Sequence, residues 1–417
     1  MSELINNRAI RQQKLKELIL KLHDNADFDE VKKEFEAMTI GVSASEITEM
    51  EQALVDEGMP VEDIQKLCDV HAAVFKGSIE DIHAANVKKD DVPGHPVAVF
   101  KDENRAVERL LEGALKKALG AFKKSDTHGT RTALEAAVNQ LLTIDTHYRR
   151  KENLLFPLME KYGITAPPQV MWGVDDEIRE KIKGVLAALK EETTDAAAIS
   201  EQVAAMTNQV SEMIFKEEQI MFPMTLEAFN DDDWTSVEAA SDEFGYTLIG
   251  RPVHRVKIAE QDEPAKKVST DGSALTGQVA KDTKQEVAFD AGALTAEEVN
   301  AILNTVPVDM TFVGADNKVK YFSQGKERIF QRPLTIIGRE VKHCHPPKSV
   351  HIVEQIVADL RSGKKDHEDF WIHMGEAFVY IRYFAVRSKS GEYLGTLEFS
   401  QDIKPVTELE GEKRLMS

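Results

Sequence analysis

Long hydrophobic runs are missing from this sequence of 417 residues. No stretch of about 18 apolar residues occurs, so we expect no membrane-spanning helix. The N-terminus lacks the apolar core and the small-residue cleavage site of a secretory signal. The two cysteines, Cys68 and Cys344, stand far apart and cannot build a disulfide framework. These absences favour a protein that works in the reducing cytoplasm.

Positive charge is also scarce. The chain has 52 Lys and Arg residues against 72 Asp and Glu residues, which gives a formal net charge of -20. A field of this sign repels nucleic acids and anionic membranes, so we expect neither as a partner. The hydrophobic content of 42% is enough for ordinary cores. At roughly 150 residues per domain, the length predicts two or three domains.

Amphipathic helical patterns fill the first 250 residues. Residues 1–90 predict several short helices, and KLKELILKLH has one apolar stripe at helical spacing. Residues 91–250 predict four long helices with short connections. Their expected ranges are 95–122, 128–161, 167–190 and 195–229. These patterns favour an all-α N-terminal domain followed by an up-down four-helix bundle.

The composition changes after residue 250. Residues 251–288 are polar and contain Gly and Pro, so they predict a linker with room for a short strand pair. Strand patterns fill residues 289–406 and begin with a hairpin around Asp316-Asn317. KSVHIVEQIVADLRSG predicts an amphipathic helix that ends at Gly363. An antiparallel sheet with helices inserted after its second strand is an α+β layout, so the chain is expected to be multidomain.

One segment occurs twice within the predicted bundle. HYRRKENLLFP begins at His147, and MIFKEEQIMFP begins at Met213. When both copies are aligned on Phe-Pro, His147 corresponds to Met213, and Lys151 corresponds to Glu217. Residues four apart lie on the same face of a helix, so the two members of each pair are expected to share one face.

The repeat resembles the second and fourth helices of a hemerythrin-like (HHE) cation-binding bundle, in which each half supplies a His and a Glu to iron. The resemblance implies non-haem iron as a cofactor. The implied metal ligands are His95, His147, Glu152, Asp175, Glu217 and Glu218.

Within the repeat, this sequence departs from the family pattern at two positions. Lys151 stands where the family has an acidic ligand, and Met213 stands where it has a His. A Lys beside Glu217 can form a buried ion pair at the former metal position. Two interpretations stay open: a bundle that has lost some or all of its metal, and a single iron held by the remaining ligands.

The C-terminal strand order resembles a PAS domain over about residues 290–405. VPVDMTFVGADNKVKYFSQG matches the opening hairpin, YLGTLEFSQDI matches the closing strand, and GREVKHCHPPKSVHIVEQI resembles a subgroup found behind hemerythrin-like domains. Cys344, His345 and His351 form a cluster of soft ligands that could bind haem. The competing interpretation is a partly solvated loop and helix start. VDEGMPVEDIQKLCDVHAAVFKG, nearer the N-terminus, resembles an uncharacterised helical domain.

The three-part organisation predicts a cytoplasmic sensor or regulatory protein. We expect no catalytic residues of its own, and an output through a protein partner or through self-association of the PAS domain, including a homodimer. Two alternatives stay open. The bundle could handle oxygen, nitric oxide or iron for cluster repair as a non-haem iron protein, or the PAS domain could be a haem-binding sensor.

Overall fold

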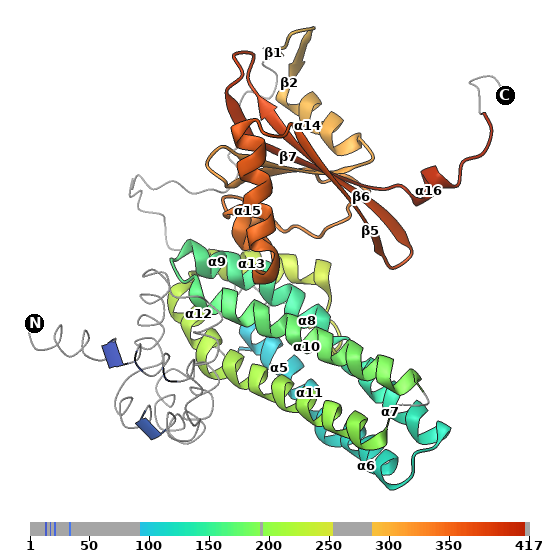
Figure 1. The fold of residues 1–417 in the computed structure, drawn as a ribbon. Coiled ribbons are helices and arrows are strands. Elements are labelled where there is room, and N and C mark those ends of the chain that lie inside the picture. Colours follow the sequence, from blue (N-terminus) through green and yellow to red (C-terminus); the bar gives the residue numbers. More distant parts are fainter. Residues whose placement is uncertain are drawn as a thin grey trace, which may run out of the picture. The chain divides into compact units, whose positions relative to one another are not determined.

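The computed structural model describes residues 92–191, 195–252 and 286–412, with a few isolated positions between 13 and 34. The described residues form a helical unit and a unit built on a sheet (Figure 1), and each is described by itself. The predicted N-terminal helical domain and most of the predicted linker lie outside the described residues. No helix in the described ranges is long and apolar enough to cross a membrane.

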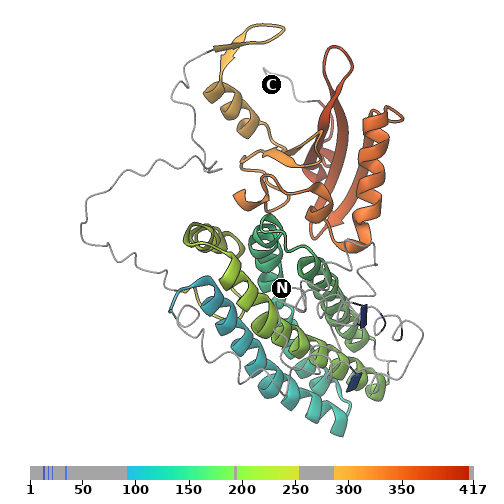
Figure 2. The same ribbon diagram turned by 90° about the vertical axis from the view of Figure 1, so that its left-hand side faces the viewer.

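The helical unit contains the four long segments expected from the sequence, which lie alongside one another in Figures 1 and 2. Three of them are built from consecutive α and π pieces. The elements are α5 (Pro96–Leu110), η2 (Leu111–Leu115), α6 (Lys116–Lys124), α7 (His128–Leu141), α8 (Ile144–Arg150), η3 (Lys151–Leu155), α9 (Phe156–Lys161), α10 (Ala166–Lys190), α11 (Ala196–Lys216), η4 (Glu217–Met221) and α12 (Phe222–Ala228). The prediction of a four-helix bundle is confirmed.

Proline accounts for two of the π segments. Pro157 and Pro223 lie at the second residue of the helices that follow η3 and η4. A proline inside a helix has no backbone N–H, and its ring clashes with the carbonyl four residues earlier. The wider π turn relieves this clash. Both copies of the repeat therefore share one backbone shape, and Lys151 and Glu217 begin it at equivalent positions.

A further helix, α13 (Asp231–Phe244), follows the fourth segment and was not predicted from the sequence. Asn230 caps it by accepting hydrogen bonds from the backbone of Asp232 and Asp233 at 2.9 Å. The first turn is entirely acidic, which suits the positive end of the helix dipole. Trp234 and Val237 are buried in the bundle core, so α13 covers one side of the helices that carry the site.

The second unit contains a five-stranded antiparallel sheet in the order β4-β3-β7-β6-β5. Figure 2 shows the helix α15 beside this sheet. The strands are β3 (Asp309–Gly314), β4 (Val319–Phe322), β5 (His367–Met374), β6 (Ala377–Arg387) and β7 (Tyr393–Asp402). The other elements are the pair β1 (Glu286–Ala288) and β2 (Ala293–Thr295), α14 (Ala296–Thr305), η5 (Leu334–Ile336), η6 (Val341–Cys344), α15 (Pro347–Ser362) and α16 (Lys404–Thr407).

Turn residues fix the path of this second unit. Asn317 has a φ of 61° in the β3–β4 turn, the left-handed conformation that Asn tolerates best after Gly. Gly363 follows α15 with a φ of 77°, so the predicted helix end is confirmed. Gly395 lets β7 pass close to β3, because a Cβ atom there would lie 2.2 Å from the Val313 carbonyl oxygen. Helices inserted between β4 and β5 confirm the predicted α+β layout.

Candidate functional site

Lys151 lies inside the bundle, at the position equivalent to Glu217 in the repeat. Both side chains are fully buried. The Lys151 Nζ lies 2.5 Å from Glu217 Oε1 and 2.9 Å from Asp175 Oδ1. Asp175 comes from α10, so side chains from three helical segments meet at one ammonium group. The predicted ion pair between Lys151 and Glu217 is confirmed.

His147 lies one helical turn before Lys151 and contacts carboxylates through both ring nitrogens. Its Nδ1 is 2.9 Å from Glu103 Oε2, and its Nε2 is 3.0 Å from Glu217 Oε2. Because a carboxylate only accepts hydrogen bonds, both ring nitrogens donate, and the ring is an imidazolium. Burial alone would lower the pKa of His147, but Glu217 and Glu103 raise it to about 9.

Glu103 projects from α5 and is fully buried. Arg150 donates to both of its oxygens, at 3.1 and 2.6 Å. The backbone N–H of Thr247, which follows α13, donates to Oε1 at 2.6 Å. Burial raises the pKa of Glu103, but the hydrogen bond from His147 and the charge of Arg150 lower it below its usual range. Glu103 is therefore a carboxylate with both oxygens compensated.

The two carboxylates on Lys151 differ in how well they are compensated. Burial raises the pKa of Glu217, but Lys151 and His147 lower it to about 2. Asp175 bonds Lys151 through Oδ1, and its buried Oδ2 has no hydrogen-bond partner. Burial raises the pKa of Asp175 to about 6, although Lys151 and Arg179 act against it. Asp175 is therefore the least satisfied of these carboxylates.

Three carboxylates and three cations thus meet in the bundle, and we call these six residues the ion cluster. They are Glu103, Asp175 and Glu217, with His147, Arg150 and Lys151. With the imidazolium counted, their formal charges sum to zero. Buried charges persist when they are paired and hydrogen-bonded. The cluster therefore compensates its charges without an added cation.

Two of the other predicted ligands lie outside the ion cluster. Glu152 is buried but bonds Arg179 at 2.8 and 3.1 Å. Glu218 is half-buried and accepts from the Asn104 side chain at 3.4 Å. Each follows a cluster residue by one position, which turns its side chain about 100° around the helix.

His95, the remaining predicted ligand in the bundle, lies at the start of α5. Its Nδ1 accepts from the Val97 backbone N–H at 3.2 Å and so caps the helix. Its ring packs against Trp234 of α13, with the ring centroids 4.7 Å apart. The structure therefore gives His95 a capping and packing role. Of the six predicted ligands, it brings together His147, Asp175 and Glu217.

The ion cluster does not fit a resident metal. A His ligand needs a free lone pair on one ring nitrogen, and His147 uses both nitrogens as donors to carboxylates. The Asp175 and Glu217 oxygens that could bind a metal here already bond the Lys151 ammonium. In the described part of the chain, no group of three or more His, Cys, Asp or Glu side chains is arranged to hold a metal ion. The implied iron site stays a prediction.

The predicted haem ligands lie at the end of η6 and the beginning of α15. Cys344 ends η6 and is half-buried, and His345 follows it. His351 is exposed on the first turns of α15. The soft-ligand cluster predicted from these three residues stays untested, and the described residues do not group them as a metal site.

A hollow of about 460 Å³ lies in the sheet unit, between α15, η6 and the β3–β4 turn. Its walls include Asn317, Glu340, Lys342, Val357 and Arg361. Arg361 donates to the Ala315 carbonyl at 2.9 Å, which ties α15 to the turn. A volume of this order is typical of small-molecule sites. The hollow is therefore the candidate ligand position of this unit.

Glu103 and Arg150 were not predicted as site residues from the sequence. A signal for Glu103 was present, because it lies between the apolar residues Phe100 and Val107 on one helical face. A charge at such a position indicates a buried partner. Arg150 carries no comparable signal, since it stands in the charged run RRKE, and only the packing against α5 distinguishes it from Arg149.

The imidazolium of His147 leads to a pH prediction. Its pKa is raised from 6.5 to about 9, so its contribution to stability is complete below 6.5 and is lost as the pH rises through about 9. We expect ¹⁵N NMR to find both ring nitrogens of His147 protonated at neutral pH. We also expect the free energy of unfolding to fall across this window. A neutral ring at neutral pH would contradict the assignment, and His147→Gln should remove this part of the pH dependence.

Three family models match the chain. Residues 15–81 match DUF438, a family of unknown function, residues 95–225 match the hemerythrin HHE cation binding domain, and residues 299–404 match a PAS domain. None of the curated proteins compared with the chain matches it.

Solved structures also match. A C-terminal domain from Streptococcus mutans is 37% identical, with 31% of this chain and 100% of that chain covered and a TM-score of 0.30. A PAS domain from Colwellia psychrerythraea is 13% identical, with 26% and 97% covered and a TM-score of 0.22. A sensory box sensor histidine kinase from Vibrio cholerae is 9% identical, with 26% and 91% covered and a TM-score of 0.21.

These TM-scores are low, so the assignment of the chain rests on the family models and on the described elements. The bundle between Pro96 and Ala228 falls within the second matched region almost entirely, and the antiparallel sheet falls within the third. The chain therefore contains three regions that match a family of unknown function, the hemerythrin HHE cation binding domain and a PAS domain.

Proposed function

We propose that this chain is a cytoplasmic sensor or regulatory protein. Its PAS domain binds a small ligand or a protein partner, and its hemerythrin-like bundle serves as a structural and regulatory module with a degenerate metal site. The observation that carries this proposal is the Lys151 ammonium, which is fully buried between Glu217 and Asp175. A cation fixed at this position compensates the buried carboxylates without iron. This supports a structural role for the bundle in place of redox chemistry.

The hollow beside α15 supports the ligand-binding part of the proposal. About half of its lining residues belong to α15, and Arg361 of this helix donates a hydrogen bond to the β3–β4 turn. Filling the hollow would change the contacts of α15 with this turn. Such a change in a helix is a physical means of passing a binding event to a partner.

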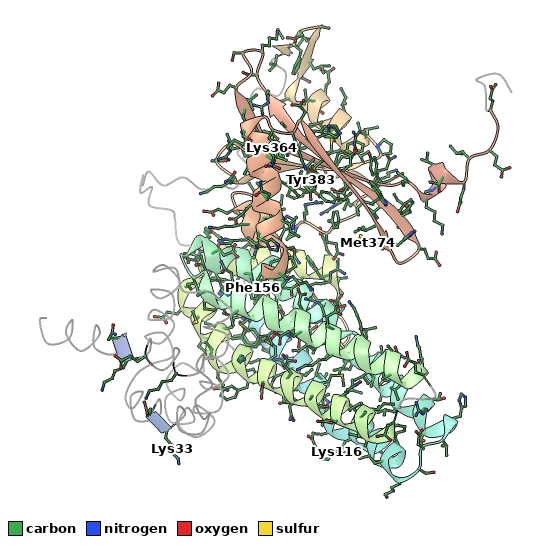
Figure 3. The ribbon with its side chains drawn as sticks, viewed as in Figure 1. Lys33, Lys116, Phe156, Lys364, Met374 and Tyr383 are labelled. Atoms are coloured by element: carbon green, nitrogen blue, oxygen red, sulfur yellow. The ribbon has the colours of Figure 1, made fainter. Side chains whose placement is uncertain are left out.

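The edge strand β5 supports the partner-binding part. Its Trp371 is 64% exposed, and Ile372 and Met374 are also exposed. Met374 lies at the end of β5, beside the turn into β6 (Figure 3). β5 is the last strand of the described sheet, so its outer edge offers unpaired backbone groups as well. A second copy of this chain could add its own strand there.

Trp371→Glu is therefore expected to weaken self-association by about tenfold or more, because aromatic anchors dominate most interfaces. Sedimentation of the full-length chain over a range of concentrations measures this effect. Leu409→Ser is the matched control, since Leu409 is equally apolar and 76% exposed but lies near the C-terminus. An unchanged dimerisation constant for Trp371→Glu would exclude β5 as the self-association surface.

A second candidate function is a non-haem iron protein, and His147 with its neighbouring carboxylates is the observation that favours it. Iron analysis and absorption spectra of the full-length protein from iron-replete cells separate the candidates. We expect neither stoichiometric iron nor a Soret band. Bound non-haem iron that His147→Ala removes would favour the iron protein, and a Soret band would favour a haem-binding PAS domain.

A further inference from the structure

The two halves of the bundle are related by the repeat, and the related positions meet. Lys151 and Glu217 lie the same distance before Phe-Pro, begin equivalent π segments and touch at 2.5 Å. The family resemblance implies a carboxylate at both positions. This chain has one cation and one carboxylate there, so one of the two acidic positions now carries the positive charge itself.

The ammonium is surrounded in the way that a bound cation would be. Its Nζ contacts Glu217 from one repeat and Asp175 from α10, and it lies 4.5 Å from the centre of the Tyr148 ring. An ammonium group has three donors. Two of them meet carboxylates, and the nearby Tyr148 ring also attracts a cation through its π electrons. Oxygen atoms and a ring from different helices therefore enclose one positive charge.

An additional cation would not be compensated in this position. Arg150 already pairs with Glu103, Lys151 already pairs with Asp175 and Glu217, and these five side chains are buried. A divalent ion would add two positive charges close to Lys151. Like charges repel strongly in a dry interior, because the effective dielectric constant is low. Displacing the Lys151 side chain to make room would leave its charge buried elsewhere in the core or would open the bundle.

We infer that the Lys151 ammonium takes the place of the metal cation, so that this hemerythrin-like bundle is closed by its own side chain and excludes divalent metal. The Lys151 ammonium bonds Oδ1 of Asp175, and the buried Oδ2 has no hydrogen-bond partner. The inference concerns the bundle alone. A PAS domain that proved to bind neither ligand nor partner would leave it standing.

Metal uptake by variants at Lys151 tests the inference. Full-length wild type, Lys151→Glu and Lys183→Glu are incubated anaerobically with ferrous iron, or with zinc, then desalted and analysed for bound metal. Lys183 is the matched control, because it lies on the exposed face of α10 with its side chain 62% exposed. We expect wild type and Lys183→Glu to retain well below one ion, and Lys151→Glu to retain about one ion per chain.

Thermal melts provide the second measurement. Lys151→Glu should melt below wild type without metal, because three buried carboxylates then lie together, and added metal should raise its melting temperature. Lys151→Met covers the case in which Lys151→Glu fails to fold, since it removes the cation without adding charge and should also gain metal.

Three outcomes would overturn the inference. In the first, wild type retains about one ion per chain and Glu217→Gln abolishes this binding. In the second, Lys151→Glu folds but gains no metal. In the third, Lys151→Glu does not fold and Lys151→Met gains no metal. If wild type is metal-free and a folded Lys151→Glu gains no metal, this inference fails but the proposed sensor function stands.

Discussion

Lys151→Met is expected to lower the free energy of unfolding of the bundle by about 3–5 kcal/mol, the typical effect of breaking a buried ion pair from one side. Glu217 and Asp175 would lose the cation that both contact. Glu217 would keep His147 as a partner, whereas Asp175 would lose its hydrogen bond from Lys151. The loss would be a large part of the roughly 5–15 kcal/mol that stabilises a typical domain.

Chemical denaturation of the full-length chain, followed by helical circular dichroism, measures this change. Lys183→Met is the control, because the Lys183 side chain is 62% exposed on α10 and should matter little. A double-mutant cycle with Glu217→Gln isolates the pair, and neighbours of this kind typically couple by about 0.5–3 kcal/mol. If Lys151→Met unfolded like wild type, Lys151 would be solvated and the ion cluster would be wrong.

Arg150→Met is expected to destabilise the bundle by a similar amount, about 3–5 kcal/mol. Arg150 donates to both oxygens of Glu103 and also to the Gly245 carbonyl at 3.1 Å. Its guanidinium lies 4.1 Å from the centre of the Phe100 ring and 4.8 Å from that of Tyr246. Loss of Arg150 would therefore leave Glu103 partly uncompensated and would detach the segment after α13 from the bundle.

Arg149→Met is a close control, since Arg149 is the adjacent residue of the same type and is exposed. Its unfolding midpoint should stay near that of wild type. Arg150→Lys separates charge from geometry, because Lys keeps the charge but cannot bond both oxygens of Glu103 in the same fork. We expect Arg150→Lys to fall between wild type and Arg150→Met. Equal midpoints for Arg149→Met and Arg150→Met would contradict the pairing with Glu103.

The sequence alone was sufficient to predict the bundle and the sheet. Helical periodicity predicted the bundle, and strand patterns with the turn at Asp316-Asn317 predicted the sheet, because both signals depend on residues close in the chain. The repeat also identified Lys151 and Glu217 as equivalent positions. The resemblance of the repeat to a hemerythrin-like bundle places both residues at the centre, so their ion pair was predicted from the sequence, and it is confirmed.

Only the tertiary structure decided which charges meet in the ion cluster. Glu103 reaches His147 across 44 residues of sequence, and Thr247 reaches Glu103 across 144. Spacing within a helix determines the face on which a side chain lies, but not the partner that packs against that face. His95 illustrates the same limit, because its position favoured a metal ligand while capping and the Trp234 ring fix its place. The apolar faces of the helices set how they pack, and this packing then determines which buried charges can compensate one another.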